Sequence, residues 1–150
     1  MNDANYMQEA LKEAENAYRS GNFPVGALLV MKHSIIARSG NRERELHDPT
    51  AHAEILVIRE AGRKLGTHRL PGSIIYTTLE PCPMCTAAMS QARVSKVVYG
   101  TRALRWTTTN LFNLVNVEIV QPRLNDGCRQ IVQKWCKENG RNIFLDHSLR

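Results

Sequence analysis

The sequence predicts an α/β domain in which a mixed sheet of about five strands is covered by helices on both faces. Strand-like runs alternate with amphipathic helical segments, which is the pattern of sheets whose strands are joined by crossover helices. The chain has 150 residues, 43% of them hydrophobic, which is enough for one hydrophobic core and too few for two. We therefore expect a single domain over residues 1–150.

The first third of the chain predicts a helix followed by a hairpin. Apolar residues recur at helical spacing over 7–18, and Gly21 stands where that helix would end. A buried strand is expected over 24–31, and 35–37 can return beside it as an antiparallel partner. The polar, charged residues of 41–48 predict a loop.

The remainder of the chain predicts further helices and strands in alternation. Helical periodicity is found at residues 51–65, 82–92 and 126–138. Strands rich in β-branched and aromatic residues are expected at residues 73–78, 96–99 and 117–120. Pro83 is compatible with a helix because the first helical turn needs no amide donor there.

Two of these helices begin with residues that can bind a metal. His52 and Glu54 lie in the first turn of one helix, and Cys82 and Cys85 share a face in the first turn of the next. If the two helices pack side by side, one imidazole and two thiolates can bind Zn²⁺ and leave a fourth position for water. Glu54 would lie beside the metal without being a ligand. The sequence thus predicts a catalytic zinc site in which Glu54 is the general base.

Two other uses of the cysteine pair are open. Cys82 and Cys85 could belong to a structural zinc site, although such sites usually bring a second Cys or His pair, or they could form a redox dithiol. Cys128 and Cys136 lie too far away to complete a knuckle and are expected to be buried as small hydrophobic side chains. His47 could approach a substrate or simply be a solvated imidazole.

The formal net charge is +6, and it is unevenly distributed. The stretch 91–106 contains no acid and four basic residues, namely Arg93, Lys96, Arg102 and Arg105. Such a stretch can bind the phosphates of a nucleic acid, or it can act only as a solubilising surface. The chain has no apolar run of about 18 residues and no secretory signal pattern, so we expect a soluble, cytoplasmic protein without a membrane partner.

Two motifs carry a family resemblance. With His52-x-Glu54 and Pro81-Cys82-x-x-Cys85, the chain resembles the zinc-dependent cytidine/deoxycytidylate deaminase superfamily. Its strongest likeness is to the bacterial tRNA adenosine deaminases. That likeness is carried by the segments 24–27, 47–54, 78–82, 117–119 and 124–128 together with Asn41. Deaminases of free guanine or cytosine share much of the same pattern.

The resemblance implies a three-layer α/β/α fold, Zn²⁺ as the cofactor and a homo-oligomer, expected to be a dimer. It also implies three substrate contacts. Asn41 would hydrogen-bond the base, the Ala53 amide would meet a ring atom, and the Glu80 carbonyl would receive the leaving amino group. For Asn41 the alternative is a loop asparagine that bonds its own backbone.

The resemblance leaves the substrate open. The leading candidate is an adenosine in tRNA, converted to inosine, and the alternative is a free base or nucleoside. The segment 101–109 departs from the tRNA enzymes, because Ala103 stands where they carry an acidic residue. Within it, Trp106 could stack on a flanking base, pack in the core or cover a free base. A third possibility is an RNA-binding or partner subunit without turnover, although that role would not require Glu54.

Overall fold

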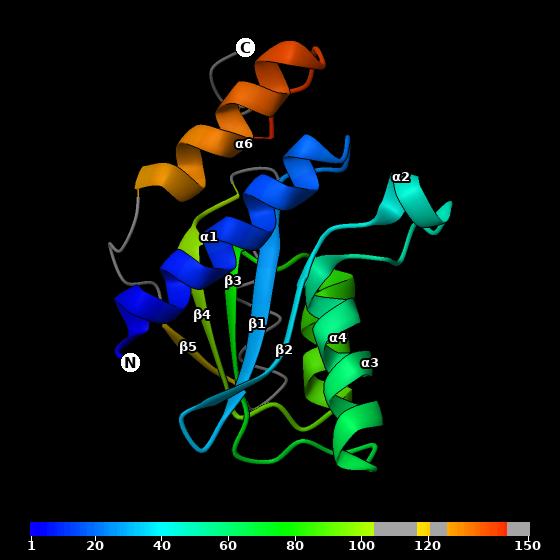
Figure 1. The fold of residues 1–150 in the computed structure, drawn as a ribbon, viewed down its shortest axis with the longest axis vertical. Helices are drawn as coiled ribbons and strands as arrows, with labels where there is room; N and C mark the ends of the chain where they lie inside the picture. The colour runs from blue at the N-terminus through cyan, green and yellow to red at the C-terminus, as the bar shows by residue number, and fades with distance from the viewer. Residues whose placement is uncertain (104–116, 121–125, 144–150) are drawn as a thin grey trace.

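The computed structural model describes residues 1–103, 117–120 and 126–143 (Figure 1). The helices are α1 (Asp3–Arg19), α2 (Glu43–Leu46), α3 (Ala53–Leu65), α4 (Pro83–Gln91) and α6 (Asp126–Glu138). The strands are β1 (Gly26–Met31), β2 (Ser34–Gly40), β3 (Ile74–Leu79), β4 (Lys96–Thr101) and β5 (Glu118–Val120). Each element coincides closely with a predicted segment, except α2.

The strands of the described residues form one sheet in the order β2-β1-β3-β4-β5. β1 is antiparallel to both of its neighbours, whereas β3, β4 and β5 are parallel. The sheet is therefore mixed, as predicted. Lys32 and His33 turn the chain between β1 and β2 with positive φ angles of 48° and 63°, which is typical of a two-residue hairpin turn.

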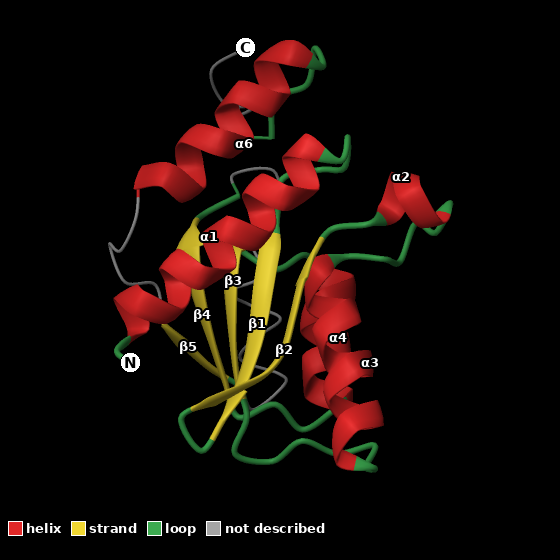
Figure 2. Ribbon diagram, viewed as in Figure 1, coloured by secondary structure: helices red, strands yellow, loops and turns green. Residues whose placement is uncertain are grey.

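Helices cover both faces of this sheet (Figure 2). α1 and α6 lie on one face, and α3 and α4 lie on the other. Successive residues of a strand point to opposite faces, and β1 accordingly divides between two buried clusters. Leu28 and Val30 pack with α1, while Ala27 and Leu29 pack with α3 and α4. The predicted three-layer α/β/α arrangement is confirmed.

α1 packs directly on the backbone of β1 at Gly26. A Cβ atom at this position would lie 2.1 Å from the Ala10 carbonyl oxygen and 2.4 Å from the Ala14 amide nitrogen. Such distances leave no room for any side chain, so the glycine allows the helix and the strand to approach each other closely. This contact holds the start of β1, and the preceding residues Phe23 and Val25, at the edge of the candidate site.

The prediction of a loop after β2 was wrong, because part of that segment forms α2. The helix has only one turn and none of its residues is buried, so it carries no apolar periodicity from which it could be predicted. The Asn41 side chain accepts a hydrogen bond from the Glu43 amide at 3.0 Å just before the helix. His47 ends it in the left-handed conformation, with a φ of 49°.

Other predictions concern residues away from the site. Cys128 and Cys136 are buried, as predicted, although they belong to different hydrophobic clusters. Arg105 and Trp106 lie outside the described residues. In the described part of the chain, no helix has the length and apolar character needed to cross a membrane.

Candidate metal and active site

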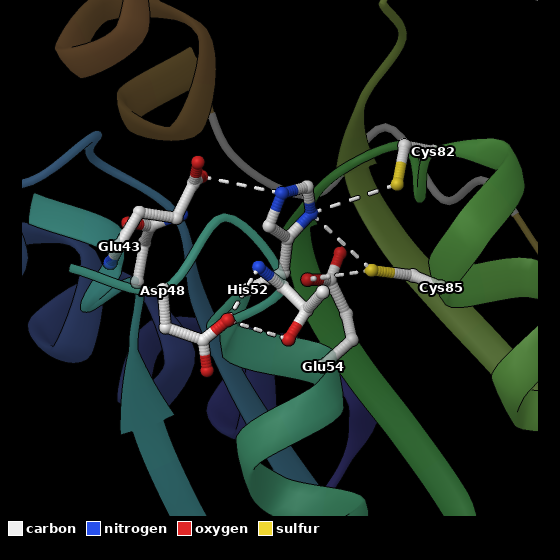
Figure 3. Close-up of polar contacts among 8 residues, drawn as sticks. Glu43, Asp48, His52, Glu54, Cys82 and Cys85 are labelled. Atoms are coloured by element: carbon white, nitrogen blue, oxygen red, sulfur yellow. Dashed lines mark hydrogen bonds and ion pairs between the residues drawn. The ribbon is translucent and has the colours of Figure 1, made fainter. Parts of the chain in front are cut away.

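The N-termini of α3 and α4 bring the three predicted metal ligands together. His52 precedes the first residue of α3, Cys82 precedes that of α4, and Cys85 lies in the first turn of α4. The His52 Nδ1 atom is 3.5 Å from Cys82 Sγ and 3.4 Å from Cys85 Sγ (Figure 3). All three ligand atoms lie within 4.8 Å of one another. The side-by-side packing predicted for these two helix starts is therefore present.

This donor set fits Zn²⁺ in both chemistry and spacing. Bonds of about 2.3 Å to sulfur and about 2.0 Å to nitrogen at a tetrahedral angle place the two ligand atoms about 3.5 Å apart. The observed nitrogen–sulfur separations are 3.4 and 3.5 Å. Within the described residues this is the only group of three metal-binding side chains. Three protein ligands leave one tetrahedral position open, as in catalytic zinc sites.

Hydrogen bonding within the cluster favours the thiolate form of Cys82. The pKa of Cys82 is lowered to about 4 by the hydrogen bond from Cys85, with a further contribution from His52. The hydrogen bond to Cys82 raises the pKa of His52 to about 9. The pKa of Cys85 is raised because its thiol donates to Cys82 and is buried. A zinc ion must displace the protons of Cys85 and His52, so its binding should release protons.

Glu54 lies beside the three ligands and points toward them from α3 (Figure 3). Its side chain is buried, and Thr77 Oγ1 donates a hydrogen bond to Oε1 at 3.1 Å. The other oxygen, Oε2, is 3.7 Å from Cys85 Sγ. Burial desolvates the carboxylate and raises the pKa of Glu54 above its ordinary value. A buried carboxyl group with this placement is suited to accept and return a proton.

The three residues expected to contact a substrate lie next to this cluster. Asn41 and Glu80 are both 2% exposed and line a cavity that also contains Glu54. Its volume of about 40 Å³ is smaller than a purine base, so it has room only for the reacting edge of one. Ala53 begins α3, where amide groups have no partner inside the helix. Asn41 and Glu80 therefore share one cavity beside the start of α3, and their contacts with a substrate, like that of Ala53, stay predictions.

A second cavity, which we call the vestibule, adjoins the first and was not predicted. It has a volume of about 350 Å³, shares Asn41 and His52 with the inner cavity, and opens to solvent. The guanidinium carbons of Arg44 and Arg141 lie 5.6 and 5.8 Å from the ring centroid of Trp135. These three side chains line the vestibule and come from α2, α6 and the segment after α6. Only folding brings them together.

Glu43 was also not predicted as a site residue. Its Oε1 atom lies 3.2 Å from His52 Nε2 (Figure 3). The same oxygen accepts a hydrogen bond from Asn41 Nδ2 at 2.6 Å. Nothing in the sequence distinguishes Glu43 from Glu45 two residues later, because both lie in the same short polar segment. The contact with a predicted metal ligand is the feature that separates them.

Comparison with known families identifies this arrangement. Residues 1–101 match the family model for the cytidine and deoxycytidylate deaminase zinc-binding region. The chain belongs to this deaminase family. The match contains His52, Glu54, Cys82 and Cys85 and ends with the last residue of β4. The family model describes a zinc-binding region, and the donor set of His52, Cys82 and Cys85 fits zinc. Both observations support the predicted zinc cofactor.

Within the deaminase family, individual relatives show which members this chain resembles in sequence. A tRNA-specific adenosine deaminase of Agrobacterium fabrum is 56% identical over 95 residues, which are 63% of this chain and 62% of the relative. The chain spans about three fifths of the length of the first curated relatives that it matches. The predicted resemblance to tRNA adenosine deaminases is confirmed at the level of sequence.

Solved deaminase structures share the fold. One, from a study of A-to-I editing by tRNA:A34 deaminases, aligns with a TM-score of 0.80 at 40% identity and covers 85% of this chain and 98% of its own. A guanine deaminase from Bacillus subtilis aligns with a TM-score of 0.66 at 28% identity over 97% of this chain and 100% of its own. The predicted cytidine deaminase-like fold is therefore confirmed.

Proposed function

We propose that this chain is a zinc-dependent hydrolytic deaminase that converts an adenosine held in tRNA to inosine and releases ammonia. The observation that carries the proposal is the buried Glu54 carboxyl group, which lies beside a three-ligand zinc site without belonging to it. A site that only stabilises the fold has no use for such a group. The sequence likeness to tRNA adenosine deaminases supplies the substrate class.

The chemistry divides between the metal and the carboxyl group. Zn²⁺ held by His52, Cys82 and Cys85 would supply Lewis-acid activation of water. Glu54 accepts a proton from the attacking water at Oε2 and transfers it to the ring nitrogen beside the amino-bearing carbon. It then takes the remaining proton from the newly added hydroxyl group and passes it to the amino group, so that the carbonyl forms and ammonia leaves. Thr77 holds Oε1 throughout, which keeps Oε2 directed toward the reacting atoms.

The base itself is held by groups around the inner cavity. In this proposal Asn41 hydrogen-bonds the base from one side, and the Glu80 carbonyl accepts a hydrogen bond from the amino group. The amide of Ala53 meets a ring atom. Because the inner cavity admits only an edge of the base, the sugar and the flanking phosphates of the substrate lie in the vestibule.

The vestibule favours a polynucleotide over a free base. Arg44 and Arg141 line it, and in the described residues neither makes an ion pair with a carboxylate. Both guanidinium groups contact the ring of Trp135. Because this contact already restricts their rotamers, they lose less side-chain entropy when they bind a ligand. Arginine side chains of this kind suit phosphate groups, which a free base lacks.

The decisive experiment offers the zinc-loaded protein a tRNA pool and, separately, adenosine, guanine and cytosine. We expect inosine to form in the tRNA, with stoichiometric ammonia, and Glu54→Gln to slow its formation by about 10²- to 10⁴-fold while retaining zinc. Deamination of free guanine or cytosine without action on tRNA would contradict the proposal. A protein that binds tRNA but turns over no substrate would instead be a binding subunit.

The second candidate is deamination of a free base. The 28% identity to a guanine deaminase over nearly the whole of both chains favours it, and so does the departure of residues 101–109 from the tRNA enzymes. The same experiment separates it from the first candidate. Its turnover should also respond little to added salt, because an uncharged base releases no counterions when it binds.

A homodimer is part of the proposal. Ile55 and Ile58 of α3 and Ala88 of α4 line a shallow cavity of about 360 Å³, and Leu65 at the end of α3 is 44% exposed. A second copy seated over α3 and α4 would bury this surface, which reaches from Ile55 near the start of α3 to the far ends of both helices. Sedimentation at micromolar concentration should give the mass of a dimer, and a monomer would contradict it.

The proposed location is the cytoplasm. All of the cysteines that the structure describes are free, as thiols are in a reducing compartment.

A further inference from the structure

The carboxylate of Glu43 lies on the side of His52 opposite the two cysteines (Figure 3). His52 Nδ1 faces Cys82 Sγ and Cys85 Sγ, while Nε2 is 3.2 Å from Glu43 Oε1. A neutral imidazole that binds a metal through Nδ1 carries its proton on Nε2. A carboxylate at that position accepts this proton in a hydrogen bond and selects the ligating tautomer, as carboxylates commonly do for metal-bound histidines.

The same oxygen holds Asn41. Glu43 Oε1 accepts a hydrogen bond from Asn41 Nδ2 at 2.6 Å, and the Glu43 amide donates to Asn41 Oδ1 at 3.0 Å. Because one end of the Asn41 amide meets an acceptor and the other meets a donor, only one of its two flipped orientations satisfies both bonds. Glu43 therefore links a metal ligand and a residue that lines the inner cavity.

The pairing of Glu43 differs from that of the neighbouring acids. Glu45 pairs with Arg42, and Glu60 pairs with Arg63, as surface carboxylates often do. In the described residues, the ion pair that Glu43 makes is with His52 alone. Its side chain is about one-third exposed, so it lies at the boundary between solvent and the buried ligand set. The Glu43 carboxylate thus contacts the metal-ligand set, whereas the neighbouring acids pair with surface arginines.

We propose that Glu43 is a positioning residue that sets both the metal-binding tautomer of His52 and the orientation in which Asn41 meets the substrate. The His52 part of this inference is independent of the reaction, whereas the Asn41 part rests on the proposed function. One carboxylate then couples metal binding to substrate binding. Removing it should weaken both, although Glu43 touches neither the reacting atoms nor the cysteines.

The test measures zinc affinity by competition with a chelator for Glu43→Ala, Glu43→Gln and a control, Glu45→Ala. The control removes the same group from the same helix but breaks contacts with Arg42 and Asn22 and none with His52. Loss of a partner of this kind typically lowers metal affinity by about 10- to 100-fold, which is the loss expected for Glu43→Ala. Glu43→Gln keeps a neutral acceptor and should lose less. Equal affinities for Glu43→Ala and Glu45→Ala would overturn the His52 part.

A second readout isolates Asn41. With zinc at saturating concentration, Glu43→Ala should raise KM for the substrate relative to Glu45→Ala, because Asn41 Nδ2 loses its acceptor and only the main-chain amide of residue 43 still holds the side chain. An unchanged KM would overturn the Asn41 part. Thermal melting of each variant checks that it is folded. Zinc affinity is measured without substrate, so a failure of the proposed reaction would leave the first result intact.

Discussion

Replacing Arg44 and Arg141 together by alanine tests whether the vestibule binds phosphates. If each guanidinium contacts one phosphate of a single-stranded loop, the slope of log affinity against log salt becomes shallower by about 0.7 for each contact. Two contacts change the slope by about 1.4. The ratio of the wild-type affinity for tRNA to that of the variant should therefore shrink by about sevenfold between 50 and 200 mM salt. Removal of two exposed contacts with Trp135 costs about 1–2 kcal/mol of stability, which the fold should tolerate.

The assay is tRNA binding by the zinc-loaded protein across that range of salt, followed by kcat/KM for tRNA and for free adenosine. The matched control is Arg63→Ala with Lys64→Ala, which removes the same charge from α3, where both side chains pair with Glu60. Of the two double variants, only the one that lacks Arg44 and Arg141 should show a flatter salt dependence of tRNA binding. It should lower kcat/KM for tRNA and leave kcat/KM for free adenosine unchanged. Equal slopes for the two double variants would refute phosphate binding in the vestibule and leave their net charge as the only effect.

Three further outcomes are expected. Glu54→Gln should retain zinc and lose about 10²- to 10⁴-fold in kcat, the usual contribution of a general acid–base; activity within tenfold of wild type would argue against the role. Cys85→Ala should lose stoichiometric zinc on metal analysis, and retention would rule out the ligand set. Gly26→Ala should lower stability by about 1–3 kcal/mol in denaturant unfolding, because the new methyl group would lie 2.1 Å from the Ala10 carbonyl oxygen. Lys12→Ala, an exposed change on α1, is its control and should leave the midpoint nearly unchanged.

The cysteine and histidine motifs were predictable because the chemistry of their side chains is local. Cys82 and Cys85 share one helical turn, and His52 and Glu54 share another, so each pair is arranged by its own few residues. Their meeting required one additional inference, that α3 and α4 pack side by side on one face of a sheet. The alternation of strands and helices supports that inference, and the family resemblance strengthened it.

The loop predicted at residues 41–48 shows where sequence reasoning failed. α2 has no buried residue, so no hydrophobic pattern marks it. Its first-turn amides are held by Asn41, which accepts from Glu43, and by Asn22, which accepts from Glu45. A one-turn helix gains its stability from such single contacts and not from a face buried in the core. For the same reason the sequence offered no ground for choosing Glu43 over Glu45.

The sequence by itself determined the α/β class, the positions of nearly all the elements and the residues suited to bind zinc and move a proton. These follow from periodicity, from turn residues and from the chemistry of side chains a few positions apart. Only the tertiary structure decided that Glu43 contacts His52, and that Arg44 and Arg141 meet over Trp135 beside the site. Those contacts join residues from separate elements, and their geometry depends on how helices and loops pack at the end of the sheet, which no local pattern encodes.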